Sequence, residues 1–141
     1  HGGMIDKMVG DAVHALFNAP VELPEHAKKA VLCAKAIVAA TEKHRQEPDC
    51  AQTGLGRTRI GIETGLAVLG EVGLGTKRDY TAYGRVVNVA ARLEAANKIF
   101  GSSIAIGPGT AAALKGAIPL RPLGRTKLAG LDDEMEIFEP K

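Results

Sequence analysis

The sequence predicts a single α+β domain, and two kinds of pattern support this class. Residues 24–47 and 85–101 have the spacing of helices, and short apolar runs of strand length lie around them. Several of these runs follow one another through turns. Helices that interleave with hairpin-linked strands are typical of α+β folds rather than of a doubly wound parallel sheet. The chain has 141 residues, enough to enclose one hydrophobic core.

Residues 4–17 predict a β-hairpin. Two apolar runs meet at Gly10 and Asp11, a residue pair that favours a tight turn. Lys7 is unusual here, because it places a charge in the middle of the first run. A charged residue inside a short strand must face either solvent or a functional partner.

The segment 24–47 predicts the first helix. Pro24 and Glu25 suit its first turn, and basic residues occupy its last turn. One stripe of the helix is apolar and is expected to face the core; it consists of Ala27, Ala30, Val31, Ala34, Ile37, Val38 and Thr41. A polar loop follows.

The second half of the chain predicts further alternation. Extended runs are expected at residues 57–64 and 66–73, separated by Gly65, with a flexible loop at 73–79 and a short strand at 80–83. A helix then ends at Gly101, a plausible C-cap. The remaining segments predict a strand at 103–107, a short helix at 108–117, and a closing strand pair at 120–130 and 134–139.

Composition excludes several classes of function. The formal net charge is +2 with basic residues spread along the chain, and aromatic residues are scarce, so a nucleic-acid interface is not expected. No apolar run approaches the roughly 20 residues of a membrane span. Cys33 falls in a helix and Cys50 in a polar loop, which predicts neither a disulfide framework nor a metal cluster. A cytoplasmic location is therefore expected.

Asn88 and Arg92 are the first candidates for chemistry. They stand four positions apart on a predicted helix, so both project from one face beside apolar neighbours. A carboxamide and a guanidinium placed together can bind a ribose and a phosphate. Spacing alone leaves the alternative of an exposed helix face open, with Arg92 pairing with Glu94 or Glu136.

The first hairpin offers two more candidates, each with an ordinary alternative. Asp11 could hold Mg²⁺, which binds one or two carboxylates together with substrate phosphates and water; it could equally be a simple turn residue. Lys7 could recognise a base edge or a phosphate, or it could lie on a solvated strand face. Periodicity and spacing alone therefore end at an α+β domain with a possible phosphate site.

Four segments together carry a more specific signal. The stretches "GGMIDKMVGDAVHALF", "RIGIETGLAVLGEVG", "RDYTAYGRVVNVAARLE" and "LGRTKLAGLDDEMEIFEP" resemble, in order and over essentially the whole chain, the catalytic domain of the class III nucleotidyl cyclases, the adenylate and guanylate cyclases. The resemblance implies a ferredoxin-like βαββαβ core with a mainly antiparallel sheet and helices packed on it.

The resemblance also implies a reaction and its residues. The ribose 3′-hydroxyl of the nucleotide attacks its own α-phosphate and pyrophosphate leaves, with two Mg²⁺ or Mn²⁺ ions assisting. Asp11 matches a metal-binding aspartate of the family, and Asn88 matches the residue that orients the ribose. Arg92 matches the arginine that stabilises charge at the α-phosphate, Lys7 matches the residue that reads the base edge, and Thr81 matches its partner.

The family implies a head-to-tail homodimer in which Lys7 and Asp11 of one chain serve two different active sites. Lys7 offers only donors and the Thr81 hydroxyl can accept, which matches the N1 acceptor and the 6-amine of adenine. ATP is therefore the favoured substrate. A guanylate cyclase remains one alternative, and a catalytically silent dimerisation or nucleotide-sensing module remains the other.

The sequence departs from the family pattern at two places. Ala129 stands where the family usually has a lysine for the terminal phosphates, and Lys127, two residues earlier, could replace it. The family also has a preceding strand with a second metal-binding aspartate. We therefore expect residues 1–141 to be a cyclase catalytic domain that is partial at its N-terminus, the output module of a longer signalling protein, and inactive alone.

Overall fold

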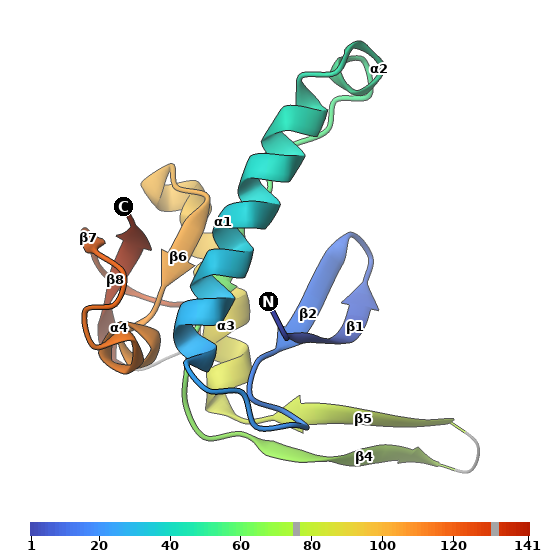
Figure 1. The fold of residues 1–141 in the computed structure, drawn as a ribbon, viewed down its shortest axis with the longest axis vertical. Coiled ribbons are helices and arrows are strands. Elements are labelled where there is room, and N and C mark those ends of the chain that lie inside the picture. The colour runs from blue at the N-terminus through green and yellow to red at the C-terminus, as the bar shows by residue number, and fades with distance from the viewer. Residues whose placement is uncertain (75–76, 131–132) are drawn as a thin grey trace.

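The computed structural model describes residues 1–74, 77–130 and 133–141 and confirms the α+β class (Figure 1). The described strands are β1 (Met4–Val9), β2 (Ala12–Leu16), β3 (Ile60–Ile62), β4 (Val68–Leu74), β5 (Lys77–Tyr83), β6 (Ile104–Ile106), β7 (Leu120–Lys127) and β8 (Glu134–Pro140). The described helices are α1 (His26–Arg45), α2 (Pro48–Ala51), α3 (Arg85–Phe100) and α4 (Pro108–Leu114). No helix in these ranges is both long and apolar enough to cross a bilayer.

A four-stranded sheet in the order β3-β6-β8-β7 forms the centre of the fold. β3 pairs with β6 in parallel, and the other two pairs are antiparallel. Strand alternation on β6 sends Ile104 and Ile106 to a core cluster with α1 and α4, whereas Ala105 joins the cluster around α3. Helices therefore cover both faces of this sheet.

Two antiparallel hairpins extend from this core (Figure 1). The predicted β1–β2 hairpin is confirmed: Val9 pairs with Ala12 across Gly10 and Asp11, and Gly10 has a φ of 60°, which a glycine adopts without strain. The predicted loop at residues 73–79 is wrong, because β4 and β5 pair as far as Leu74 and Lys77. Only Gly75 and Thr76 of that segment lie outside the described residues.

The first half of the predicted stripe on α1 is confirmed, with Ala27, Val31 and Ala34 buried against the sheet. Ile37, which was expected to face the core, is instead 43% exposed. The polar loop predicted after it instead contains the short helix α2. Pro48 occupies the first turn of α2, where a missing backbone N–H removes no hydrogen bond. Four residues are too few for periodicity to reveal a helix.

α3 lies directly on β3, and this contact sets the position of Asn88 and Arg92. A β-carbon at Gly61 would overlap the backbone of α3 at Ala90, so only glycine allows this approach. The buried Asn97 side chain donates a hydrogen bond of 3.0 Å to the carbonyl of Ile60 and thereby ties the helix to the strand. The helix ends at Gly101 in the left-handed region, as predicted.

Candidate active site

A cleft of about 500 Å³ lies between α3 and the end of β7. Its walls include Asn88 and Arg92 from the helix and Lys127 and Ala129 from the segment that ends β7. Asn88 is exposed and Arg92 is half-buried. The structure thus brings together three of the six predicted site residues, and it places two positive side chains and one carboxamide in the same hollow.

Arg92 does not make the ion pair that the ordinary alternative required. Glu94 pairs instead with Arg59, with 3.0 Å between Oε1 and Nε, and no described carboxylate lies within ion-pair distance of Arg92. The guanidinium lies against the turn that follows β7: a β-carbon at Gly130 would be 3.2 Å from Nη2 of Arg92. The guanidinium therefore lines the cleft without an ion-pair partner among the residues that the structure describes.

Lys127 is the last residue of β7, so Ala129 lies beyond the strand. The prediction that both side chains share one strand face consequently does not apply as stated. Both residues nevertheless line the cleft, while Leu128 between them is buried in the core. The exposed side chain of Lys127 therefore lies on the same cleft as Arg92 and Ala129.

Lys7 and Thr81 belong to a second group of residues, where the β1–β2 hairpin meets β5. Thr81 Oγ1 donates a hydrogen bond of 2.8 Å to Asp6 Oδ2, and Lys7 Nζ is 3.7 Å from the same oxygen. Asp6 therefore connects the two predicted base-reading residues. The sequence did not predict a role for Asp6, because an acidic residue in an apolar run looks the same in the sequence whether its side chain is buried or exposed to solvent.

Thr81 is also more enclosed than expected, with only 2% of its surface exposed. The side chain of Asp6 is 3% exposed, whereas that of Lys7 is 41% exposed. Of this group, Lys7 is the member that a ligand can reach directly. None of the three residues lines the cleft beside α3.

Asp11 is exposed at the turn of the β1–β2 hairpin, and it too lies outside the lining of the cleft. A single carboxylate at an exposed turn fits one Mg²⁺ or Mn²⁺ ion that phosphate oxygens and water help to hold. Within the described ranges, Asp11 belongs to no group of three potential metal-binding side chains. The residues present therefore fit one jointly held ion, and they do not form a preformed two-ion site.

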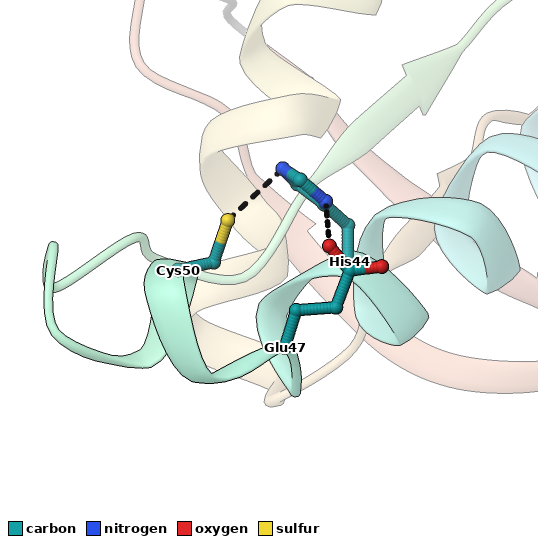
Figure 2. Close-up of side chains that lie close together, drawn as sticks. All are labelled: His44, Glu47 and Cys50. Carbon is teal, nitrogen blue, oxygen red and sulfur yellow. Dashed lines mark hydrogen bonds and ion pairs between the residues drawn. The ribbon is translucent and has the colours of Figure 1, made fainter.

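His44, Glu47 and Cys50 form a separate cluster at the end of α1 and the start of α2 (Figure 2). The sequence predicts a polar loop at Cys50 and therefore no such cluster. His44 Nδ1 is 2.9 Å from a Glu47 oxygen, and His44 Nε2 is 3.0 Å from Cys50 Sγ. Since the two ring nitrogens point in different directions, one ion could replace only one of these contacts. The geometry favours a hydrogen-bonded surface cluster over a metal site.

Glu63 follows β3 and lines a second cleft of about 260 Å³. Burial raises the pKa of its carboxyl above the ordinary value of 4.5, and hydrogen bonds from the backbone amides of Gly109 and Thr110 oppose that shift only in part. The carboxylate thereby holds the first turn of α4 against β3. This explains its position without any catalytic role.

Comparison with known proteins gives one consistent answer. The family model for the adenylate and guanylate cyclase catalytic domain matches residues 5–139. The chain is 41% identical to "Adenylate cyclase 1" of Rhizobium meliloti over 99% of its own length and 21% of that protein's. It is 34% identical to an adenylate cyclase of Anabaena cylindrica, with coverages of 99% and 28%. The chain therefore spans only 21–28% of the length of these relatives.

Solved structures of both nucleotide specificities are similar to this fold. The adenylyl cyclase CyaB from P. aeruginosa superposes with a TM-score of 0.84 at 32% identity, covering 99% of this chain and 72% of that one. The guanylyl cyclase Cya2 gives a TM-score of 0.80 at 27% identity, with coverages of 99% and 70%. The guanylate cyclase domain of RhGC from Catenaria anguillulae, solved with GTP, gives 0.78 at 26% identity, with coverages of 99% and 72%.

Proposed function

The chain belongs to the adenylate and guanylate cyclase catalytic-domain family, and we propose that it is the catalytic domain of an adenylate cyclase. In this proposal ATP is converted to 3′,5′-cyclic AMP and pyrophosphate for intracellular signalling, in the cytoplasm. The observation that carries the proposal is the cleft lined by Asn88, Arg92 and Lys127. A catalytically silent domain would not require these three side chains to line one cleft.

The cleft suits a nucleotide triphosphate in its charge and in its hydrogen-bonding groups. Arg92 would stabilise the charge that develops at the α-phosphate, which is the kind of preorganised electrostatic contribution that dominates many enzymes. Asn88, one helical turn away, would orient the ribose. Lys127 would bind the terminal phosphates in place of the lysine that position 129 lacks.

ATP is favoured over GTP because of the donors on Lys7. An ammonium can only donate, so it complements the N1 acceptor of adenine and opposes the N1–H donor of guanine. The exposed part of Lys7 makes it the reachable member of its group. Relatives of both specificities exist, so guanylate cyclase activity is the competing assignment.

Divalent metal chemistry is part of the proposal. Two Mg²⁺ or Mn²⁺ ions in a complete site would activate the ribose hydroxyl and neutralise charge on the phosphates. Asp11 is the residue of this chain that fits an ion, held together with phosphate oxygens.

A head-to-tail homodimer would complete the site. Asp11 lies outside the cleft of its own chain, so a second copy would bring the metal-binding carboxylate to it, while Lys7 of that copy would serve the other site. The two hairpins also expose apolar side chains that a partner would cover. Those more than half exposed are Ile5, Met8, Val9, Val13, Val68 and Val72.

A competition assay tests the substrate assignment. The full-length protein that contains residues 1–141 is incubated with equal concentrations of ATP and GTP and with Mn²⁺, and both cyclic products are quantified by mass spectrometry. We expect cyclic AMP to dominate. Predominant cyclic GMP would establish the guanylate alternative, and binding of both nucleotides without any cyclic product would favour the silent module.

A further inference from the structure

The carboxylate of Asp6 is buried, and its neighbours engage only one of its two oxygens. Its side chain is 3% exposed, and only Oδ2 is engaged, by Thr81 at 2.8 Å and by Lys7 at 3.7 Å. Among the described residues Oδ1 has no hydrogen-bond partner. An incompletely paired buried carboxylate destabilises a fold. Stability alone therefore does not explain why this position is acidic.

A β-bulge at Asp6 explains how it reaches Lys7. Ile5 pairs with Ala15 and Lys7 pairs with His14, so Asp6 is the extra residue between two regular pairs. Consecutive side chains on a regular strand point to opposite faces. The bulge breaks that alternation and lets a buried carboxylate approach the ammonium of its own neighbour, which remains 41% exposed.

The hydrogen bond to Thr81 has only one possible direction when Asp6 is ionised. A carboxylate can only accept, so the Thr81 hydroxyl donates its proton to Asp6. Thr81 is also 2% exposed, which leaves it almost no surface for a ligand. The Thr81 hydroxyl on β5 therefore holds Asp6 in place, whereas Lys7 is the contact of Asp6 that remains exposed to solvent.

We propose that Asp6 is the positioning residue of base recognition: it holds the Lys7 ammonium toward the base, and Thr81 acts on nucleotide choice by fixing Asp6 rather than by touching the base. This inference rests on the proposed adenylate cyclase function and names the residue through which its specificity is set. In this arrangement the buried side chains of Asp6 and Thr81 control the position of the Lys7 ammonium, and neither of them contacts the nucleotide.

Asp6→Asn is the primary test, because asparagine keeps an acceptor for Thr81 and removes the charge that holds Lys7. We expect the ratio of kcat/KM for ATP to that for GTP to fall by roughly tenfold, mainly through a higher KM for ATP, as for loss of one charge-assisted contact. Asp49→Asn is the matched control, since Asp49 is exposed on α2, and it should leave the ratio unchanged. An unchanged ratio in Asp6→Asn would overturn the proposal.

Thr81 variants separate the indirect role from direct contact. Thr81→Ser keeps the hydroxyl and should retain the ATP preference, whereas Thr81→Val removes it and should lower the preference. In an Asp6→Asn background, Thr81→Val should add little, because both changes act on Lys7 through one contact. Full additivity of the two effects would show that Thr81 reads the base itself and would overturn the proposal.

Binding measurements keep the test independent of turnover and folding. Affinities for ATP and GTP are measured by displacement of a fluorescent nucleotide, with thermal melts and light scattering for every variant. Should Asp6→Asn fail to fold, the comparison of Thr81→Ser with Thr81→Val decides the question alone: equal ATP preference in the two would contradict the proposal. Failure of the unmodified protein to bind either nucleotide would contradict the proposed function as well, and would be visible before any variant is compared.

Discussion

Arg92 of α3 and Lys127 at the end of β7 line one cleft, although they lie on elements that are far apart in the sequence. Leu128, beside Lys127, packs in the same core cluster as Val89 and Leu93 of α3. Core packing therefore fixes the relative position of the two backbone segments that carry these cations. Because the two cations come from different elements, each can be replaced without the other and its role tested separately.

Replacement of Arg92 should affect the chemical step. Arg92→Ala is expected to lower kcat for ATP by about 10²–10³ with a much smaller change in KM, because a preorganised charge acts mainly on the transition state. The control is Arg121→Ala, which removes an exposed arginine of β7 that pairs with Glu139. Steady-state kinetics decide between the roles: a higher KM with unchanged kcat would limit Arg92 to ground-state binding.

Lys127 should act on the terminal phosphates. Lys127→Ala is expected to raise KM for ATP by roughly tenfold, since one charge-assisted contact is lost. The affinity for AMP, which has no terminal phosphates, should change less. The compensating variant is Ala129→Lys in the Lys127→Ala background, which should restore KM because both positions line the cleft. No effect of Lys127→Ala, together with a gain from Ala129→Lys alone, would show that Lys127 does not replace the missing lysine.

A mixing experiment tests whether the site is shared between chains. Lys7→Ala and Asp11→Ala homodimers should each be inactive or nearly so. Mixed dimers should recover activity, because one of their two sites would contain both intact residues. Subunit exchange is verified by native mass spectrometry, and confirmed mixed dimers without activity would contradict the shared site.

Glu63 predicts a pH dependence of stability. Its folded-state pKa is raised above 4.5 by burial, so the folded state binds the proton more tightly than the unfolded state does. Proton binding to Glu63 therefore stabilises the folded state at low pH, and the free energy of unfolding decreases as pH rises from about 4.5 through the raised pKa. Glu63→Gln removes the titration, and its stability relative to the unmodified protein should increase over that interval. Urea unfolding at a series of pH values measures the difference; a constant difference, or one that shrinks with pH, would refute the assignment.

Local pattern was enough to predict most of the fold. α1 and α3 were recognisable from their apolar spacing and C-terminal residues, and the first hairpin from Gly10 and Asp11. The extent of β4 and β5 was not, because their glycines and charged residues have low strand propensity. Cross-strand hydrogen bonds stabilise those positions regardless of side chain, and a single sequence does not display pairing partners.

The sequence predicted that two of the candidate residues lie together, but it did not reveal the contacts made by the others. The spacing of Asn88 and Arg92 placed them on one helix face, and the cleft that they line confirms that they lie together. Asp6 was missed because a β-bulge determines its direction, and bulges depend on the register of two strands. The burial of Thr81 could not be predicted from the sequence either, since it results from a contact between the first hairpin and β5.

The most direct test of the central claim is the product formed from ATP. The full-length protein that contains residues 1–141 is purified and incubated with ATP and Mn²⁺, because residues 1–141 are expected to be inactive alone. The nucleotides are separated by chromatography, and Arg92→Ala in the same protein serves as the paired control for contaminating activity. The adenylate cyclase assignment predicts cyclic AMP and pyrophosphate in equal amounts, with the signal greatly reduced in the control. Absence of cyclic AMP from a folded, dimeric protein that binds ATP would contradict it.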